Sequence, residues 1–157
     1  MKRSIIILST LVAFFVFSST SCENEPSTQI KAIESSIYNQ IKAHRLVSDP
    51  NDNLVHQYVM VQEAQLYSAS MAFGIQEVDT SGIDPHWAIL HDKFGGTNDL
   101  TLVQSIISSA TAQEIVQIWK DNPETNSLLL LDYSQCGAGV EISNGIAYVT
   151  VLMMLVE

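Results

Sequence analysis

The sequence predicts an α+β fold in which helices pack on a small antiparallel sheet. Apolar residues recur at helical spacing in the first half of the chain, and β-rich runs dominate its end. The segment Ser143-Asn144-Gly145 separates two of these runs, and Asn-Gly in this position is typical of a β-hairpin. Because helices come first and strands last, we expect separate layers of helix and sheet.

The composition indicates one compact acidic domain. The chain has 157 residues, of which 46% are hydrophobic and 15% charged. Such a chain is too apolar to be disordered. With 7 Lys+Arg against 17 Asp+Glu, the formal net charge is -10. This charge repels phosphate backbones, so we expect no nucleic-acid partner.

The first 21 residues have the pattern of a lipoprotein-type signal peptide. Lys2 and Arg3 precede an apolar stretch over 5–17, and small residues lead to Cys22. The apolar stretch is shorter than the ~20 residues of a membrane span, which argues against the alternative of a signal anchor. The residues before Cys22 resemble a bacterial lipobox. We therefore expect Cys22 to be lipidated, with residues 22–29 as an acidic and polar tether.

Lipidation would place the protein outside the cytoplasm, anchored to a bacterial membrane, with the outer membrane or cell surface as the expected site. Glu23 and Glu25 loosely resemble an export signal for the outer leaflet. Acylation of Cys22 would leave Cys136 without a disulfide partner. We expect Cys136 to be a small buried thiol, and the alternative is a nucleophile.

Two long helices are predicted in the first half of the chain. Isoleucines recur at steps of three and four residues from Ile30 to Ile41, and Asp49-Pro50 ends this first helix. A second helix is predicted from Leu54 to about Phe73, with Gly74 as its stop. Its buried stripe is predicted to contain Leu54, Tyr58, Val61, Ala64 or Gln65, and Ser68 or Met71.

The second half begins with an expected irregular region over 75–96, with one possible helical turn at 86–91. Thr111 and Glu114 match a capping box, so a third helix starts there, and Asn122-Pro123 closes it. Residues 128–131 are predicted to form a short buried strand. The runs 139–142 and 146–155 are predicted to form the hairpin.

Several short motifs in a fixed order resemble the CAP superfamily of cysteine-rich secretory, antigen 5 and pathogenesis-related 1 proteins, also called SCP-like domains. The resemblance covers residues 30–157. It rests on Ile41-Lys42-Ala43-His44-Arg45, Ala64-Gln65 with Met71-Ala72, His86, Ala112-Gln113-Glu114-Ile115-Val116 with Trp119, Asn122-Pro123, and Gly137-Ala138-Gly139-Val140 before Tyr148. It implies a three-layer α-β-α sandwich with a small central antiparallel sheet. It also implies a shallow cavity lined by His and Glu, which in some members holds a divalent metal.

The chain departs from the family where the cavity residues are expected. The Gly-Glu-Asn segment of the family falls on Leu102-Val103-Gln104, or less well on Gly96-Thr97-Asn98, and neither supplies the glutamate. In the family's Ser-Pro-x-His-Arg motif, Thr125 replaces the histidine and Asn126 the arginine. Lys42 stands where the family usually has asparagine, whereas Arg45 is kept. The resemblance therefore implies a degenerate cavity.

The candidate cavity residues are His86, His91, Glu124 and Thr125. His86 is a possible metal ligand or a hydrogen-bonded structural histidine. Zinc needs about three or four protein ligands, and no His or Cys cluster supplies them. On a helix His86 and His91 would point about 140° apart, so they converge only on a loop. No catalytic residue and no cofactor is predicted, with zinc at His86 as the alternative.

Three functions remain open. The first is a non-enzymatic, envelope-anchored domain that binds a small apolar molecule, an envelope component or a protein. The alternative is a metal-dependent hydrolase of peptide or envelope substrates that uses His86 with Glu124 or Asp92. The third is a purely structural envelope module. Convergence of the side chains at His86, and the presence of a ligand-sized pocket, distinguish these readings.

Overall fold

The computed structural model describes residues 28–77, 83–94, 100–108 and 111–156. In these ranges the elements are α1 (Thr28–Ser48), β1 (Val55–His56), α2 (Tyr58–Ala72), α3 (Ile83–Phe94), β2 (Leu100–Ser108), α4 (Ala112–Asp121), α5 (Pro123–Leu129), β3 (Gln135–Ser143) and β4 (Ile146–Met154). The predicted leader 1–21, the lipidation site Cys22 and the segment Gly96-Thr97-Asn98 lie outside the described residues.

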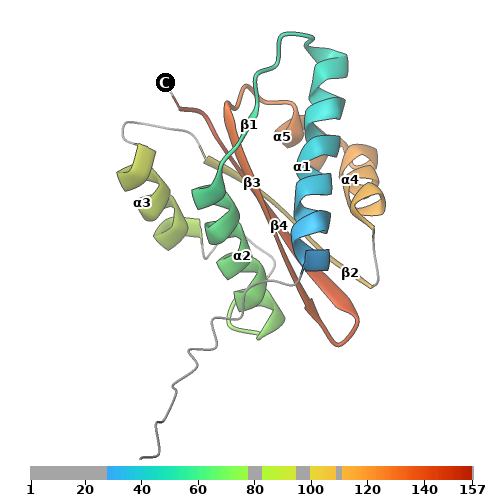
Figure 1. Ribbon diagram of the computed structural model, residues 1–157, viewed down its shortest axis with the longest axis vertical. Coiled ribbons are helices and arrows are strands. Elements are labelled where there is room, and N and C mark those ends of the chain that lie inside the picture. The colour runs from blue at the N-terminus through green and yellow to red at the C-terminus, as the bar shows by residue number, and fades with distance from the viewer. Residues whose placement is uncertain (1–27, 78–82, 95–99, 109–110, 157) are drawn as a thin grey trace, which may run out of the picture.

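Helices cover both faces of a single sheet (Figure 1). On one face α1 and α4 pack together, and Trp119 of α4 shares a buried cluster with Val151 of β4. On the other face Met60 of α2 and Leu90 of α3 share a cluster with Leu152 of β4. Neighbouring residues of β4 serve opposite clusters because side chains alternate along a strand. The predicted α+β sandwich with helical layers on both faces of the sheet is confirmed.

The sheet has the strand order β1-β3-β4-β2. The pairs β2–β4 and β3–β4 are antiparallel over nine residues each, as predicted. The pair β1–β3 is parallel, with Val55 opposite Gln135 and His56 opposite Cys136. The sheet is therefore mixed, and the expectation of an entirely antiparallel sheet is corrected at one edge. A parallel pairing of only two residues is too short to be predicted from a sequence pattern.

The first helix and the hairpin follow the predictions. α1 begins at Thr28, two residues before the expected Ile30, and buries Ile37 and Ile41. Asn144 and Gly145 connect β3 and β4 with φ values of 53° and 76°, the conformation that a type I′ turn requires. No helix in the described ranges has the length and the apolar character needed to cross a membrane.

The second helix is shorter than predicted, and its buried stripe differs from the prediction at the first two positions. Leu54 is buried ahead of β1 and lies outside α2, whereas Tyr58 is 72% exposed at the first position of α2. The predicted positions Val61, Ala64, Ser68 and Met71 are buried, and Met60, Glu63 and Tyr67 complete the buried face. The apolar residues on the exposed side of α2 obscure this periodicity.

Three further elements differ from the predictions. α3 is a helix of 12 residues where a largely irregular region was expected. The predicted strand 128–131 is wrong, since Leu128 and Leu129 end α5. Asn122 closes α4 and also caps α5 by accepting hydrogen bonds from the backbone N–H groups of Glu124 and Thr125. The long edge strand β2 was not predicted. The capping box of Thr111 and Glu114 is confirmed.

Two glycines bring α2 against the sheet. A Cβ atom at Gly139 would overlap the backbone of Ala64 and Gln65, and one at Gly137 would overlap the backbone of Met60 and Val61. Any larger residue at either position would push α2 away from β3. The contact places the side chains of α2 over the sheet face that also carries α3.

The contacts along β3 define two ends of the molecule. α2 runs parallel to β3, because Met60 lies against Gly137 and Ala64 against Gly139. α1 runs the opposite way, since Glu34 near its start bonds Val140 and Arg45 near its end bonds Tyr133. The start of α1, the end of α2 and the β3–β4 turn therefore share one end (Figure 1), called the hairpin end. The opposite end is called the far end.

Candidate functional site

His86 of α3 pairs with a carboxylate of α2. Its Nδ1 lies 2.7 Å from Oε2 of Glu63, and the two side chains are 13% and 10% exposed. The imidazole also lies against the ring of Tyr67, with 5.0 Å between the ring centroids. The helix pair α2–α3 thus holds one histidine and one glutamate in a half-buried contact. The pair can exchange a proton or contribute two ligands to a cation.

The sequence predicts Glu124 or Asp92 as the carboxylate partner of His86, whereas the structure pairs His86 with Glu63. Glu63 lies 23 residues earlier. A signal was present, since Glu63 shares a helical face with Met60 and Tyr67. A carboxylate on a predominantly apolar helix face needs a hydrogen-bonding or charged partner. Glu63 therefore indicates a histidine or a cation close to it.

The structure does not bring His91 or Asp92 to His86. His91 stacks on Trp87, with 4.7 Å between the ring centroids, on α3 itself. Because this segment is helical, His86 and His91 diverge as the 140° estimate requires. Asp92 is exposed. The loop geometry that would let the two histidines converge is absent from α3.

Glu124 and Thr125 lie in the other helical layer, in the first turn of α5. Glu124 is exposed, and the hydroxyl of Thr125 donates to the carbonyl oxygen of Trp119 at 2.8 Å. α5 packs with α4, on the face opposite α2 and α3. The sheet therefore separates these two candidates from His86, and the four candidate residues do not form one cavity in the described structure.

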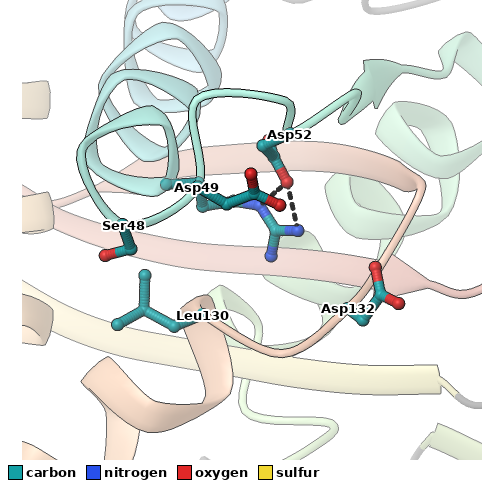
Figure 2. A pocket seen from close by; sticks show the side chains of 6 residues that line it. Ser48, Asp49, Asp52, Leu130 and Asp132 are labelled. Atoms are coloured by element: carbon teal, nitrogen blue, oxygen red, sulfur yellow. Dashed lines mark hydrogen bonds and ion pairs between the residues drawn. The ribbon is translucent and has the colours of Figure 1, made fainter.

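Arg45 lies beside a cavity of about 180 Å³ at the far end, together with Ser48, Asp49, Asp52, Leu130 and Asp132 (Figure 2). Its Nε donates to Oδ1 of Asp52 at 2.8 Å, and its other nitrogens donate to Asp52 and to the carbonyl oxygens of Leu129, Leu131 and Tyr133. These bonds account for all five guanidinium N–H groups. Arg45 therefore ties α1 to the segment after α5 and has no donor left for a ligand.

Comparison with solved structures identifies the architecture. The chain superposes on an outer surface protein from Borrelia burgdorferi with a TM-score of 0.58, at 15% identity, covering 85% of this chain and 96% of that one. It superposes on a cysteine-rich secretory protein from Staphylococcus aureus with a TM-score of 0.54, at 18% identity, covering 82% of this chain and 40% of that one. The chain has the CAP superfamily fold. No family model and no curated protein sequence matches it.

A third CAP structure agrees with this assignment. An extracellular protein of Bacillus anthracis that contains an SCP domain superposes with a TM-score of 0.52, at 17% identity, over 83% of this chain and 45% of that one. The Staphylococcus and Bacillus proteins are thus more than twice as long as the part they share with this chain. The common part is the CAP domain, and the likeness extends to its fold alone.

The positions at which this chain departs from the CAP sequence pattern have structural partners. Asn126 Oδ1 lies 2.7 Å from Nε2 of His44, which joins α5 to α1. Lys42 lies 5.8 Å from the ring centroid of Tyr38 and donates to its hydroxyl at 3.4 Å. Val103 is buried, and the amide of Gln104 contacts the sulfur of Met71. None of these described side chains supplies a carboxylate to His86.

The described residues hold no group of three or more His, Cys, Asp or Glu side chains placed to share a metal ion. His86 and Glu63 provide two such side chains. The buried carboxylate of Glu34 belongs to a different hydrogen-bond network. Glu34 accepts hydrogen bonds from the Gln65 amide and from the Val140 N–H. Burial raises the pKa of Glu34, and these hydrogen bonds partly offset that rise.

A second cavity lies between α1 and α4. It has a volume of about 420 Å³ and is lined by Gln40, Ala43, His44, Val47, Val116, Gln117 and Lys120. We call it the α1–α4 groove. Its apolar part comes from alanine and valine side chains, and its polar part carries an ammonium group and an imidazole. No carboxylate is among its lining residues, although acids outnumber bases in the chain.

Cys136 of β3 is fully buried. Burial raises the pKa of its thiol to about 12, so the nucleophilic thiolate is scarce at neutral pH. The position supports the expectation of a packing cysteine over the nucleophile alternative.

Proposed function

We propose that the protein is an extracytoplasmic, envelope-anchored CAP-type binding domain without enzymatic activity. Its ligand is a molecule with an apolar body and an anionic group, held in the α1–α4 groove. The observation that carries this proposal is the lining of the groove. An apolar floor with one ammonium group and no carboxylate favours such a ligand in a chain with a net charge of -10.

The location part of the proposal has separate support. The leader pattern before Cys22 favours export and lipidation. The similar solved structures include an outer surface protein and an extracellular protein. A lipid-anchored domain of this kind would present the groove to molecules outside the cytoplasm.

Calorimetric titration with dodecanoate tests the groove. We expect saturable binding to the purified Cys22→Ser protein, and loss of binding in Ala43→Trp, because the indole fills the groove. Lys120→Gln is expected to weaken binding about fivefold, the effect of one partly exposed charge pair. Ala88→Trp is the matched control, since Ala88 is exposed on α3 outside the groove.

Two results would count against this assignment. Equal binding by the Ala43→Trp and Ala88→Trp variants would place the ligand elsewhere on the molecule. Absence of saturable binding in the parent protein would remove the anionic apolar ligand from consideration.

The second candidate function is a metal-dependent hydrolase. The His86–Glu63 pair is the observation that favours it. Because two ligands are fewer than a zinc site needs, we expect zinc titration to give only weak, non-stoichiometric binding. His86→Ala should bind zinc like the parent protein. Stoichiometric binding that His86→Ala and Glu63→Gln abolish, while His91→Ala retains it, would favour the hydrolase over the binding domain.

A further inference from the structure

Three large apolar side chains are exposed around the C-terminal end of α2. Leu66, Phe73 and Ile75 are 57%, 72% and 75% exposed. We call these three residues the apolar tip. Exposing Phe and Ile to this extent is unfavourable unless another surface covers them.

The local backbone arranges these side chains together. Leu66 and Phe73 are seven residues apart, so on a helix they point within about 20° of each other. Gly74 then ends the helix with a φ of 68°, and its N–H donates to the carbonyl oxygen of Met71. The N–H of Ile75 donates back to the carbonyl oxygen of Ser70. This helix stop keeps Ile75 beside the last turn of α2.

The tip lies at the hairpin end, where α1 also begins (Figure 1). Five residues, 23–27, separate Cys22 from Thr28, the first residue of α1. Even a fully extended chain of this length reaches only ~20 Å. A lipid attached to Cys22, as the proposed function requires, would therefore hold the hairpin end close to the bilayer.

The charge distribution favours the same orientation. The far end carries exposed acidic side chains near the end of α1, around α5 and in the segment that follows it, namely Asp49, Asp121, Glu124 and Asp132. Apolar residues such as Val47 and Leu131 are also exposed there, but carboxylates stand beside them. Glu77 is an exposed carboxylate two residues after Ile75, but the far end carries several exposed carboxylates. Anionic headgroups therefore repel the far end more strongly than the apolar tip.

We propose that the apolar tip inserts into the surface of the membrane that anchors the protein. The lipid on Cys22 and the side chains of Leu66, Phe73 and Ile75 then form two attachments at one end of the domain. Two attachments hold far longer than a single one. They also fix the orientation, with the far end directed away from the bilayer. This inference rests on the proposed anchoring at Cys22.

The test compares two positions on one helix. Phe73 and Tyr58 are both 72% exposed and lie at opposite ends of α2, about 22 Å apart by helical rise. The lipidated full-length variants Phe73→Cys and Tyr58→Cys are labelled with an environment-sensitive thiol probe. They are then reconstituted on vesicles of phosphatidylethanolamine and phosphatidylglycerol that contain a lipid-borne quencher.

We expect a blue shift and strong quenching of the probe at position 73, and solution-like emission at position 58. Ile75→Asp in the Phe73→Cys protein should abolish the shift. Equal emission at the two positions would overturn the orientation while leaving the anchor intact. Metabolic labelling with an alkyne fatty acid reports the anchor itself, and absence of label that depends on Cys22 would overturn both the anchoring and this inference.

Discussion

Gly139→Ala is expected to destabilise the domain by about 3 kcal/mol or more, at the upper end of overpacking effects. The added methyl group would overlap backbone atoms of Ala64 and Gln65, which no rotamer change can move. Relief requires α2 to shift away from β3, which also weakens the hydrogen bond from Ser68 Oγ to the carbonyl oxygen of Gly139. Urea unfolding followed by circular dichroism measures the loss of stability. A variant that yields little folded protein would also agree with this prediction.

Gly74→Ala is the matched control for this change. An added Cβ at Gly74 meets no atom within 4 Å, and its cost arises from the φ of 68° alone. That cost is about 1 to 2 kcal/mol. If Gly139→Ala costs no more than Gly74→Ala, α2 does not approach β3 as closely as described.

Arg45→Met is expected to cost about 3 to 5 kcal/mol, because it removes one partner of a buried ion pair. The change leaves Asp52 without its counter-charge and deprives three backbone carbonyl oxygens of their donor. Arg45→Lys should recover only part of the loss, since an ammonium group cannot reproduce the planar fork of donors. Thermal and urea unfolding report both variants.

Lys42→Met on the same helix provides the comparison for Arg45→Met. Lys42 donates to the hydroxyl of Tyr38 and lies over its ring, so its replacement should change stability by less than about 0.5 kcal/mol. Similar losses of stability for Lys42→Met and Arg45→Met would show that Arg45 stabilises the fold by side-chain packing and not through its hydrogen bonds and ion pair. The double variant Arg45→Met with Asp52→Leu should recover stability if the unpaired carboxylate dominates the cost.

Local signals predicted the elements that local interactions determine. The isoleucine spacing of α1, the capping box before α4 and the Asn144-Gly145 turn each act within a few residues, and each was predicted correctly. β1 and β2 depend on pairing with strands far along the chain, so their own sequences give little indication of them. α5 was missed for another reason, since Asn122-Pro123 was interpreted only as a stop, although proline is also common in the first turn of a helix.

The candidate site was less predictable than the fold. His86 has a hydrogen-bond partner from α2, and only the packing of α3 on α2 brings Glu63 to it. Glu124 and Thr125 were grouped with His86 by the family pattern, whereas the sheet separates them. The α1–α4 groove combines residues from two helices that no short motif connects.

The burial of Cys136 also affects how the folded domain responds to oxidants. Among the described residues Cys136 is the free cysteine, and both its depth in the sheet and its pKa of about 12 keep the thiol protonated. Oxidants and foreign disulfides react with the thiolate. The folded domain therefore resists sulfenic acid formation and mixed disulfides at Cys136, and only unfolding would expose this thiol to them.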